Sequence, residues 1–237
     1  MDRRKVLQLF SAGIGLPLAA AAGGDHHGAA AGASSTPLSE PHAHFCGIHV
    51  AKRDPKFQLI TQHYCCAHSQ RGHEDLFQCV LFDRAGTGAK LLGVEYIVSD
   101  KVYRELPDAE KRFWHAHTYE VLGGGLIAPG MSADEETQFM KSLLTTWGKV
   151  WHTWPDPASP VPMGEPLLIW SLMGDGQVDE WLVAERDKQF GCSVDEIRQR
   201  RGRAIGYEAP KVAFPRSLDT IGRQWTDQGD DRPTKRS

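Results

Sequence analysis

Residues 76–99 read LFQCVLFDRAGTGAKLLGVEYIVS, and this stretch decides the fold. Its first part, Leu76–Asp83, is a short and nearly continuous apolar run, which indicates a central strand covered on both faces. Residues 83–88 (DRAGTG) then mark a turn, and Lys90–Ser99 returns as a second strand. We therefore predict a β-hairpin with a longer loop.

The second strand of this hairpin carries a carboxylate, Glu95. Successive side chains of a strand point to opposite faces, so Glu95 shares a face with Leu91, Gly93 and Ile97 and is expected inside. A buried carboxylate must be paired, protonated or bound to a metal ion. Glu95 is therefore the most informative acidic residue of the chain.

Around the hairpin, the chain predicts strands early and helices late. Further strands are expected at residues 44–50, 59–68 and 167–172, with an extended segment at 115–122. Helices are expected at residues 107–114, at 133–151, at 179–190 and from 193 to about 203. Two of them open with the capping boxes Ser132–Glu135 and Ser193–Glu196. This order predicts a single α+β domain, residues 41–226, with an antiparallel sheet mainly from the N-terminal half and helices mainly in the C-terminal half.

The two ends of the chain are expected to lie outside this domain. Residues 1–22 place the pair Arg3-Arg4 before a weakly hydrophobic run and an A-x-A site, which resembles a bacterial Tat signal peptide. An ordinary Sec signal and an uncleaved anchor are the alternatives, but the run is short for a membrane span, so we expect removal and a periplasmic location. Residues 23–40 predict a flexible Gly/Ala/Ser linker, and residues 227–237 predict a disordered polar tail.

The composition excludes some classes of protein. With 237 residues, 41% of them hydrophobic, the chain can bury a core of moderate size. The net charge is −3 with acids and bases interspersed, so there is no footprint for nucleic acid. No stretch after the signal peptide is apolar enough to cross a membrane, so the mature chain is expected to have no transmembrane segment.

The five cysteines are an odd number, and export permits disulfides. Cys46 could pair with Cys65 or Cys66 if their strands are neighbours. Cys79 lies in the central strand and is expected to be a small core hydrophobe.

Residues 114–120, WHAHTYE, hold the densest group of candidate functional side chains. In an extended segment, His115 and His117 project together, which is the geometry in which two imidazoles share a metal ion. Glu120 falls on the opposite face of a regular strand unless a bulge redirects it. The alternative is that these histidines only pack and form hydrogen bonds at a helix–strand junction.

A shared site can form if the strands bring these residues together. His63 lies on a strand face with Leu59, Thr61 and Cys65, in a strand of the same predicted sheet. The candidate ligands for a divalent metal ion, Zn, Fe or Mn, are His63, Glu95, His115, His117 and Glu120. A buried Glu–His hydrogen-bonded pair that only stabilises the core is the competing interpretation.

Known catalytic motifs do not match. The chain has no G-x-S-x-G elbow, no Walker A sequence and no G-x-G-x-x-G opening a helix. A cupin is the closest rival, but the spacing from His117 to Glu120 is one residue short and the second cupin motif is missing around residues 167–173.

Five motifs in order resemble the oil body-associated protein family, also called the DUF1264 family. They are QHYCCAH (62–68), FQCVLFD (77–83), GVEYIVSDKVY (93–103), WHAHTYEVLGGGLIAPG (114–130) and WGKVWHTW (147–154). The resemblance covers roughly residues 41–225. Plant members are associated with seed lipid bodies, so it implies a lipid or envelope surface as a partner, and it carries over no catalytic residues. Relatives often have a His-His pair where this chain has Gln62-His63.

Two functional hypotheses follow. In the first, the chain is an exported, non-catalytic protein whose buried His/Glu cluster is structural or holds a structural metal ion. In the second, it is a metal-dependent enzyme that uses a His63/His115/His117 site with Glu95 or Glu120 as a further ligand or general base. A site open to solvent favours the enzyme, a closed site favours the structural role, and an exposed apolar patch far from the histidines favours lipid association. Since nothing in the sequence specifies a substrate, the first hypothesis is preferred.

Overall fold

The computed structural model describes residues 43–67 and 76–206. The predictions for residues 1–22, 23–40 and 227–237 lie outside the described residues. The strands are β1 (Ala43–Ala51), β2 (Asp54–Ala67), β3 (Leu76–Phe82), β4 (Leu91–Ser99), β5 (His115–Ala116), β6 (Thr146–His152) and β7 (Leu167–Trp170). The helices are α2 (Asp100–Glu105), α3 (Asp108–Lys111), α4 (Thr118–Leu122), α5 (Ala133–Leu143), α6 (Glu180–Phe190) and α7 (Val194–Ile205).

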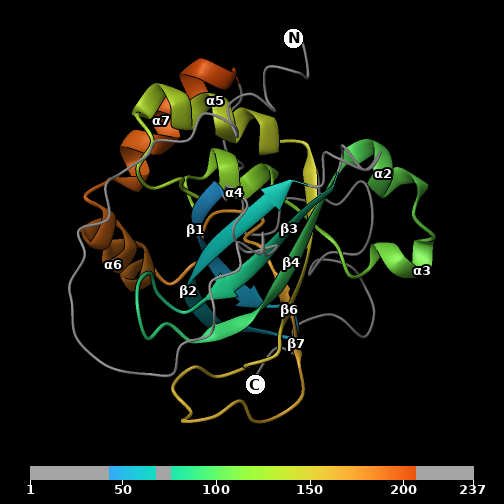
Figure 1. Ribbon diagram of the computed structural model, residues 1–237. Coiled ribbons are helices and arrows are strands. Elements are labelled where there is room, and N and C mark those ends of the chain that lie inside the picture. The colour runs from blue at the N-terminus through green and yellow to red at the C-terminus, as the bar shows by residue number, and fades with distance from the viewer. Residues whose placement is uncertain (1–42, 68–75, 207–237) are drawn as a thin grey trace, which may run out of the picture. The chain divides into compact units, whose positions relative to one another are not determined.

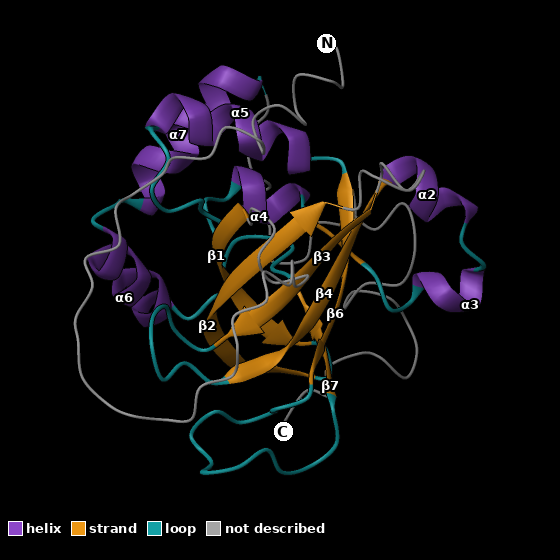
Figure 2. Cartoon of the chain, viewed as in Figure 1, coloured by secondary structure: helices purple, strands orange, loops and turns teal. Residues whose placement is uncertain are grey.

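Six of the strands close into an antiparallel barrel (Figure 1, Figure 2). β1, β2, β3 and β4 follow one another as an antiparallel meander. β4 then pairs with β6, β6 with β7, and β7 with β1, which completes the ring. The predicted α+β class and antiparallel sheet are confirmed, and closure adds an interior that side chains from every strand can share.

The hairpin at residues 76–99 forms as predicted, with β3 and β4 antiparallel. Glu95 and Ile97 are buried, but Leu91 is 50% exposed. The expectation that Leu91 shares their face is wrong because the register of the hairpin shifts between Leu81 and Phe82. A shift of this kind reverses the faces of the residues beyond it.

The barrel closes through the pairing of β4 with β6, and we call this junction the seam. The prediction of one long helix at residues 133–151 is wrong here. Helix α5 begins after its predicted capping box but ends at Leu143, and the residues with Trp147 and Trp151 form β6. Two residues four apart share a face in a helix and also in a strand, so their spacing does not distinguish the two. Residues 146–152 form a strand because they pair with β4. Gly93 permits this approach, because an added Cβ there would lie 1.9 Å from the carbonyl oxygen of Trp151.

The segment at residues 115–122 is not extended, contrary to the prediction. Only His115 and Ala116 pair with β6, and α4 follows directly. His117 has helical torsion angles, φ −85° and ψ −2°, and its carbonyl accepts a hydrogen bond from Val121 N. β5 pairs with β6 over two residues only, and the residues after it form helical hydrogen bonds with one another.

Helices cover parts of this barrel. α4, α5 and α7 pack against one another, and Figure 1 shows them together beyond one end of the strands. The helix predicted at residues 107–114 is confined to α3, and α2, capped by the hydroxyl of Ser99, was not predicted. None of the helices in the described ranges is long and apolar enough to cross a membrane.

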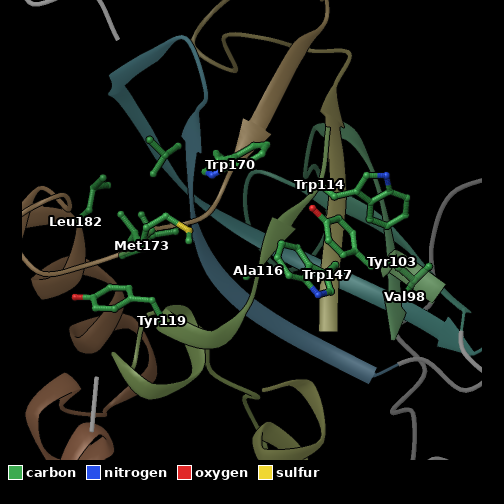
Figure 3. Close-up of a cluster of buried hydrophobic side chains, with 12 residues drawn as sticks. Val98, Tyr103, Trp114, Ala116, Tyr119, Trp147, Trp170, Met173 and Leu182 are labelled. Carbon is green, nitrogen blue, oxygen red and sulfur yellow. The ribbon is translucent and has the colours of Figure 1, made fainter. Parts of the chain in front are cut away.

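A buried apolar cluster fixes α2, α4 and α6 against the sheet (Figure 3). The rings of Tyr103 in α2 and Trp147 in β6 stack with centroids 3.8 Å apart. On the other side, Leu182 of α6 and Met173 lie near Tyr119 of α4 (Figure 3). These contacts hold the seam strand and the segment after β5 in place.

The structure contains a disulfide whose connectivity the sequence left open. Cys65 and Cys79 lie directly opposite each other on β2 and β3 and form a disulfide. Cys46 is free and buried, and its partner in register on β2 is Gln62, so pairing with Cys65 or Cys66 is wrong. The prediction of Cys79 as a free core residue is likewise wrong, because the register of β2 and β3 places it opposite Cys65.

Candidate metal centre

One closed cavity lies inside the barrel, and its polar lining consists of His49, His63, Glu95, His115, His117 and Glu120. Each of these residues is at most 5% exposed. The space for the centre of a water-sized sphere is about 10 Å³, which is about enough for one water molecule. The barrel therefore encloses a group of ionisable side chains that has little access to solvent.

All five predicted site residues line this cavity: His63 from β2, Glu95 from β4, His115 from β5, and His117 and Glu120 at the start of α4. A regular strand would direct Glu120 away from the histidines. Because α4 is a helix, the chain turns and returns this carboxylate to the cavity.

A hydrogen bond to Thr146 shows that Nδ1 of His117 carries a proton. Its Nδ1 lies 2.7 Å from Thr146 Oγ1, and this hydroxyl donates to the carbonyl of Leu143 at 2.8 Å. A hydroxyl has one proton, so Thr146 accepts from His117, which donates from Nδ1. In the neutral ring, Nε2 then carries a lone pair.

That lone pair faces a carboxylate. Nε2 of His117 lies 3.3 Å from Oε1 of Glu95, and Nε2 of His115 lies 3.9 Å from the same oxygen. Two acceptors in contact repel each other unless a cation joins them, either a proton on Nε2 or a metal ion. A proton on His117 would serve one histidine, whereas a metal ion would serve both.

These three atoms pack closely against a glycine. A Cβ built on Gly148 of β6 would lie 2.4 Å from Oε1 of Glu95. The same point is 2.7 Å from Nε2 of His117 and 2.8 Å from Nε2 of His115. We call Glu95, His115 and His117 the first triad. Its ligand atoms converge against the backbone of β6, where a side chain in place of Gly148 would collide with all three.

The distances fit a metal ion. Zinc binds imidazole nitrogen at about 2.0–2.1 Å and carboxylate oxygen at about 2.0–2.2 Å, so ligands at tetrahedral angles are about 3.3–3.5 Å apart. The 3.3 Å separation in the first triad already fits, the 3.9 Å separation must close by about 0.4–0.6 Å, and all three ligand atoms lie within 4.8 Å of one another. Two imidazoles and one carboxylate suit Zn, Fe or Mn.

Two further histidines belong to the cluster and were not predicted. Nε2 of His49 in β1 lies 2.8 Å from Nε2 of His63, and its Nδ1 lies 2.9 Å from Nε2 of His152 in β6. His63 also approaches Oε2 of Glu95, at 3.4 Å. Their signal in the sequence was alternation, since His152 follows Gly148 and Val150 at every second position of a strand.

Burial favours the neutral form of His115 and His152. It lowers the pKa of His115 to about 3, with a further contribution from His117, and lowers the pKa of His152 to about 3. Burial alone raises the pKa of Glu95, but without a metal ion a proton on Nε2 of His117, donated to the carboxylate, and a protonated His63 nearby bring that pKa below its ordinary value. Glu95 is therefore ionised at neutral pH while His115 and His152 are neutral, and these are protonation states that bind metal.

Glu120 behaves differently from Glu95. Burial, together with the charge of Glu95, raises the pKa of Glu120 well above its ordinary value. Two carboxylates in one closed cavity resist ionising together.

Buried arginines hold the segment that follows α4. Arg201 of α7 donates to the carbonyls of Val121 and Leu126 and pairs with Glu136 of α5. Its side chain is fully buried. This ion pair fixes the end of the segment that carries His117 and Glu120.

Comparison with known proteins identifies the family. Residues 35–204 match the family described as "Protein of unknown function (DUF1264)". The chain belongs to the DUF1264, or oil body-associated, family. It is 40% identical to oil body-associated protein 1A of Zea mays over 73% of this chain and 71% of that protein. It is 35% identical to oil body-associated protein 1B of Arabidopsis thaliana, over 74% of this chain and 71% of that protein. No solved structure matches the chain.

Proposed function

We propose that this member of the oil body-associated family is a non-catalytic protein whose first triad holds one divalent metal ion inside the barrel. The observation that carries the proposal is the convergence of Glu95, His115 and His117 in the buried cavity, with one ligand atom of each within 4.8 Å of the other two. Three acceptor atoms that converge in this way form a donor set for a cation.

The enclosure supports a structural role for the ion. The cavity has room for about one water molecule, so the site offers little volume to a substrate. An ion there would link Glu95 of β4 to His115 of β5 and to His117 before α4. Free energy of metal binding to the folded state adds to folding stability. The ion would therefore stabilise the barrel at its seam.

Elemental analysis of protein purified without a polyhistidine tag tests the proposal. We expect at least one equivalent of a divalent metal per chain, and loss of the equivalent held by the first triad in a His115→Ala/His117→Ala variant that still folds by circular dichroism. His44→Ala is the matched control, because His44 lies outside the cavity lining and bonds to Gln62. A folded wild-type protein that neither contains metal nor binds added Zn²⁺ would contradict the proposal.

The second candidate is a metal-dependent enzyme, and Glu120 is the observation that favours it. This carboxylate lines the same cavity as His63 and the first triad, without being needed in that triad. In an enzyme, Glu95 would serve as a ligand and Glu120 as a general base beside the ion. Hydrolase and oxygenase screens of metal-loaded protein test this. Activity that Glu120→Gln abolishes while metal content stays constant would establish the enzyme and overturn the non-catalytic proposal.

We also propose that the protein acts at a lipid or envelope surface, as the names of its relatives imply for those proteins. The supporting observation is an apolar patch on β4: Leu91, Val94 and Tyr96 are 50%, 37% and 41% exposed. Val94 and Tyr96 neighbour Glu95 in the strand and point away from the cavity. Flotation with phospholipid-coated oil droplets tests the patch. Val94→Ser/Tyr96→Ser should remain in the aqueous layer while Trp181→Ser floats, and equal flotation of both would contradict the proposal.

Export to the periplasm is the proposal for localisation. The Tat-like residues 1–22 and the disulfide Cys65–Cys79 support it, since disulfides persist in oxidising compartments. Intact mass of the protein expressed with its own N-terminus tests it. Cleavage near residue 22 that Arg3→Lys/Arg4→Lys prevents is the expected result, and an uncut cytoplasmic chain would contradict it.

A further inference from the structure

A second group of ligand atoms lies on the other side of Glu95. His49, His63 and Glu95, the second triad, place one ligand atom each within 4.8 Å of one another, as the first triad does. Within residues 43–67 and 76–206, no such group combines a histidine of one triad with a histidine of the other. Ligands on one ion with bonds of about 2.1 Å are at most about 4.2 Å apart. One ion therefore does not reach both pairs of histidines without rearrangement.

Hydrogen bonds alone satisfy the second triad poorly. Nε2 of His63 faces both Nε2 of His49, at 2.8 Å, and Oε2 of Glu95, at 3.4 Å. If this nitrogen carries a proton, it can direct that proton to one of them. If it instead accepts a hydrogen bond from His49, this nitrogen carries a lone pair, which repels the nearby carboxylate of Glu95. A cation at this point would instead be shared by three acceptors.

The remaining histidine is placed to orient a ligand. With Nε2 of His49 turned to the second triad, its Nδ1–H can donate to Nε2 of His152 at 2.9 Å. A histidine that binds metal usually donates its other ring N–H to a neighbouring acceptor, which fixes the ring and its tautomer. His117 has the same arrangement with Thr146 in the first triad. Each triad thus contains one histidine with a second partner behind it.

We propose that the second triad binds a second divalent metal ion, so that Glu95 bridges a two-metal centre through its two carboxylate oxygens. Oε1 faces His115 and His117, and Oε2 faces His63. Ions joined in this way lie about 3.5–4 Å apart in known two-metal sites. Glu120, on the same cavity, supplies a second carboxylate to such a pair. The inference rests on the proposed function because both ions share Glu95.

Counting metal ions tests the proposal. Full-length chain is stripped with a chelator, reloaded with Zn²⁺, freed of excess by gel filtration, and analysed for zinc. We expect two equivalents in the wild type and one in His49→Phe, which removes a ligand of the second triad but keeps a ring of similar size. His44→Phe is the control outside the cavity and should retain two equivalents.

Reloading with Mn²⁺ gives a second measurement that does not depend on a variant. Two ions bridged by one carboxylate give a spin-coupled electron paramagnetic resonance spectrum, whereas a single ion gives an isolated six-line spectrum. One zinc equivalent in wild type and in His49→Phe, with an uncoupled manganese spectrum, would overturn the second site and leave the proposed function intact. No bound metal in folded wild type would overturn both.

Discussion

The substitution Gly148→Ala places a methyl group at the centre of the first triad. The added carbon would lie 2.4 Å from Oε1 of Glu95 and 2.7–2.8 Å from the two imidazole nitrogens. Ordinary contact begins at 3.4 Å, so the three atoms must retreat by about 0.6–1.0 Å in a close-packed interior. The backbone tolerates alanine at this strand position, because φ of Gly148 is not positive. The variant is therefore expected to fold with the three ligand atoms pushed out of the arrangement that binds the ion.

Two effects on the melting temperature separate packing from metal binding. Overpacking costs about 1–3 kcal/mol, and 1 kcal/mol shifts Tm by about 2–4 °C at this size, so metal-free Gly148→Ala should melt about 2–12 °C lower than wild type. Zn²⁺ at 1,000 times its Kd should stabilise the wild type by about 4.1 kcal/mol, or about 8–16 °C. The variant should lack the part of this rise that comes from the first triad.

Gly125→Ala is the matched control for this experiment. It is the same substitution at a buried glycine, but its nearest neighbour would be a side-chain carbon of Leu172 at an ordinary 3.7 Å. Differential scanning fluorimetry with and without Zn²⁺, together with calorimetric titration, gives both readings. A Gly148→Ala protein that binds zinc with the affinity of wild type would refute the assignment of the first triad.

Three further outcomes are expected. Thr146→Val removes the acceptor for Nδ1 of His117 and should weaken zinc binding about 10–100-fold in a competition titration, and unchanged affinity would speak against this orientation. Arg201→Met breaks a buried ion pair and should lower the free energy of unfolding in urea by about 3–5 kcal/mol. The control Arg203→Met, at an exposed position, should change it by no more than about 0.5 kcal/mol. Equal losses in the two variants would contradict the role of the buried pair. Burial lowers the pKa of His115 from 6.5 to about 3, so between these values the unfolded chain binds a proton that the folded chain does not. Metal-free protein should lose stability as pH falls through this window, and a flat profile would contradict the neutral ring.

The sequence predicted much of the fold because strong local signals agreed with tertiary structure. The hairpin at residues 76–99 combined apolar strands with a glycine turn, and the boxes at Ser132 and Ser193 placed the starts of α5 and α7. Barrel closure could not be predicted in the same way. It depends on β6, where Trp147 and Trp151 have a spacing that helices and strands share.

The candidate site was predicted in part for a related reason. Glu95 and His63 follow from strand alternation, because each lies among residues of an inward face. His49 and His152 are single histidines 103 positions apart with no motif between them, and only closure of the barrel brings them within hydrogen-bonding distance. Glu120 reached the cavity through a five-residue helix, α4, whose start depends on how far β5 pairs with β6.

An anomalous difference map from crystals of untagged protein loaded with Zn²⁺, collected at the zinc absorption edge, tests the central claim most directly. The account predicts a peak beside Gly148, about 2.0–2.2 Å from Oε1 of Glu95 and from Nε2 of His115 and His117. A map without a peak in the barrel, with His117 and Glu95 still 3.3 Å apart and joined by a proton, would contradict it.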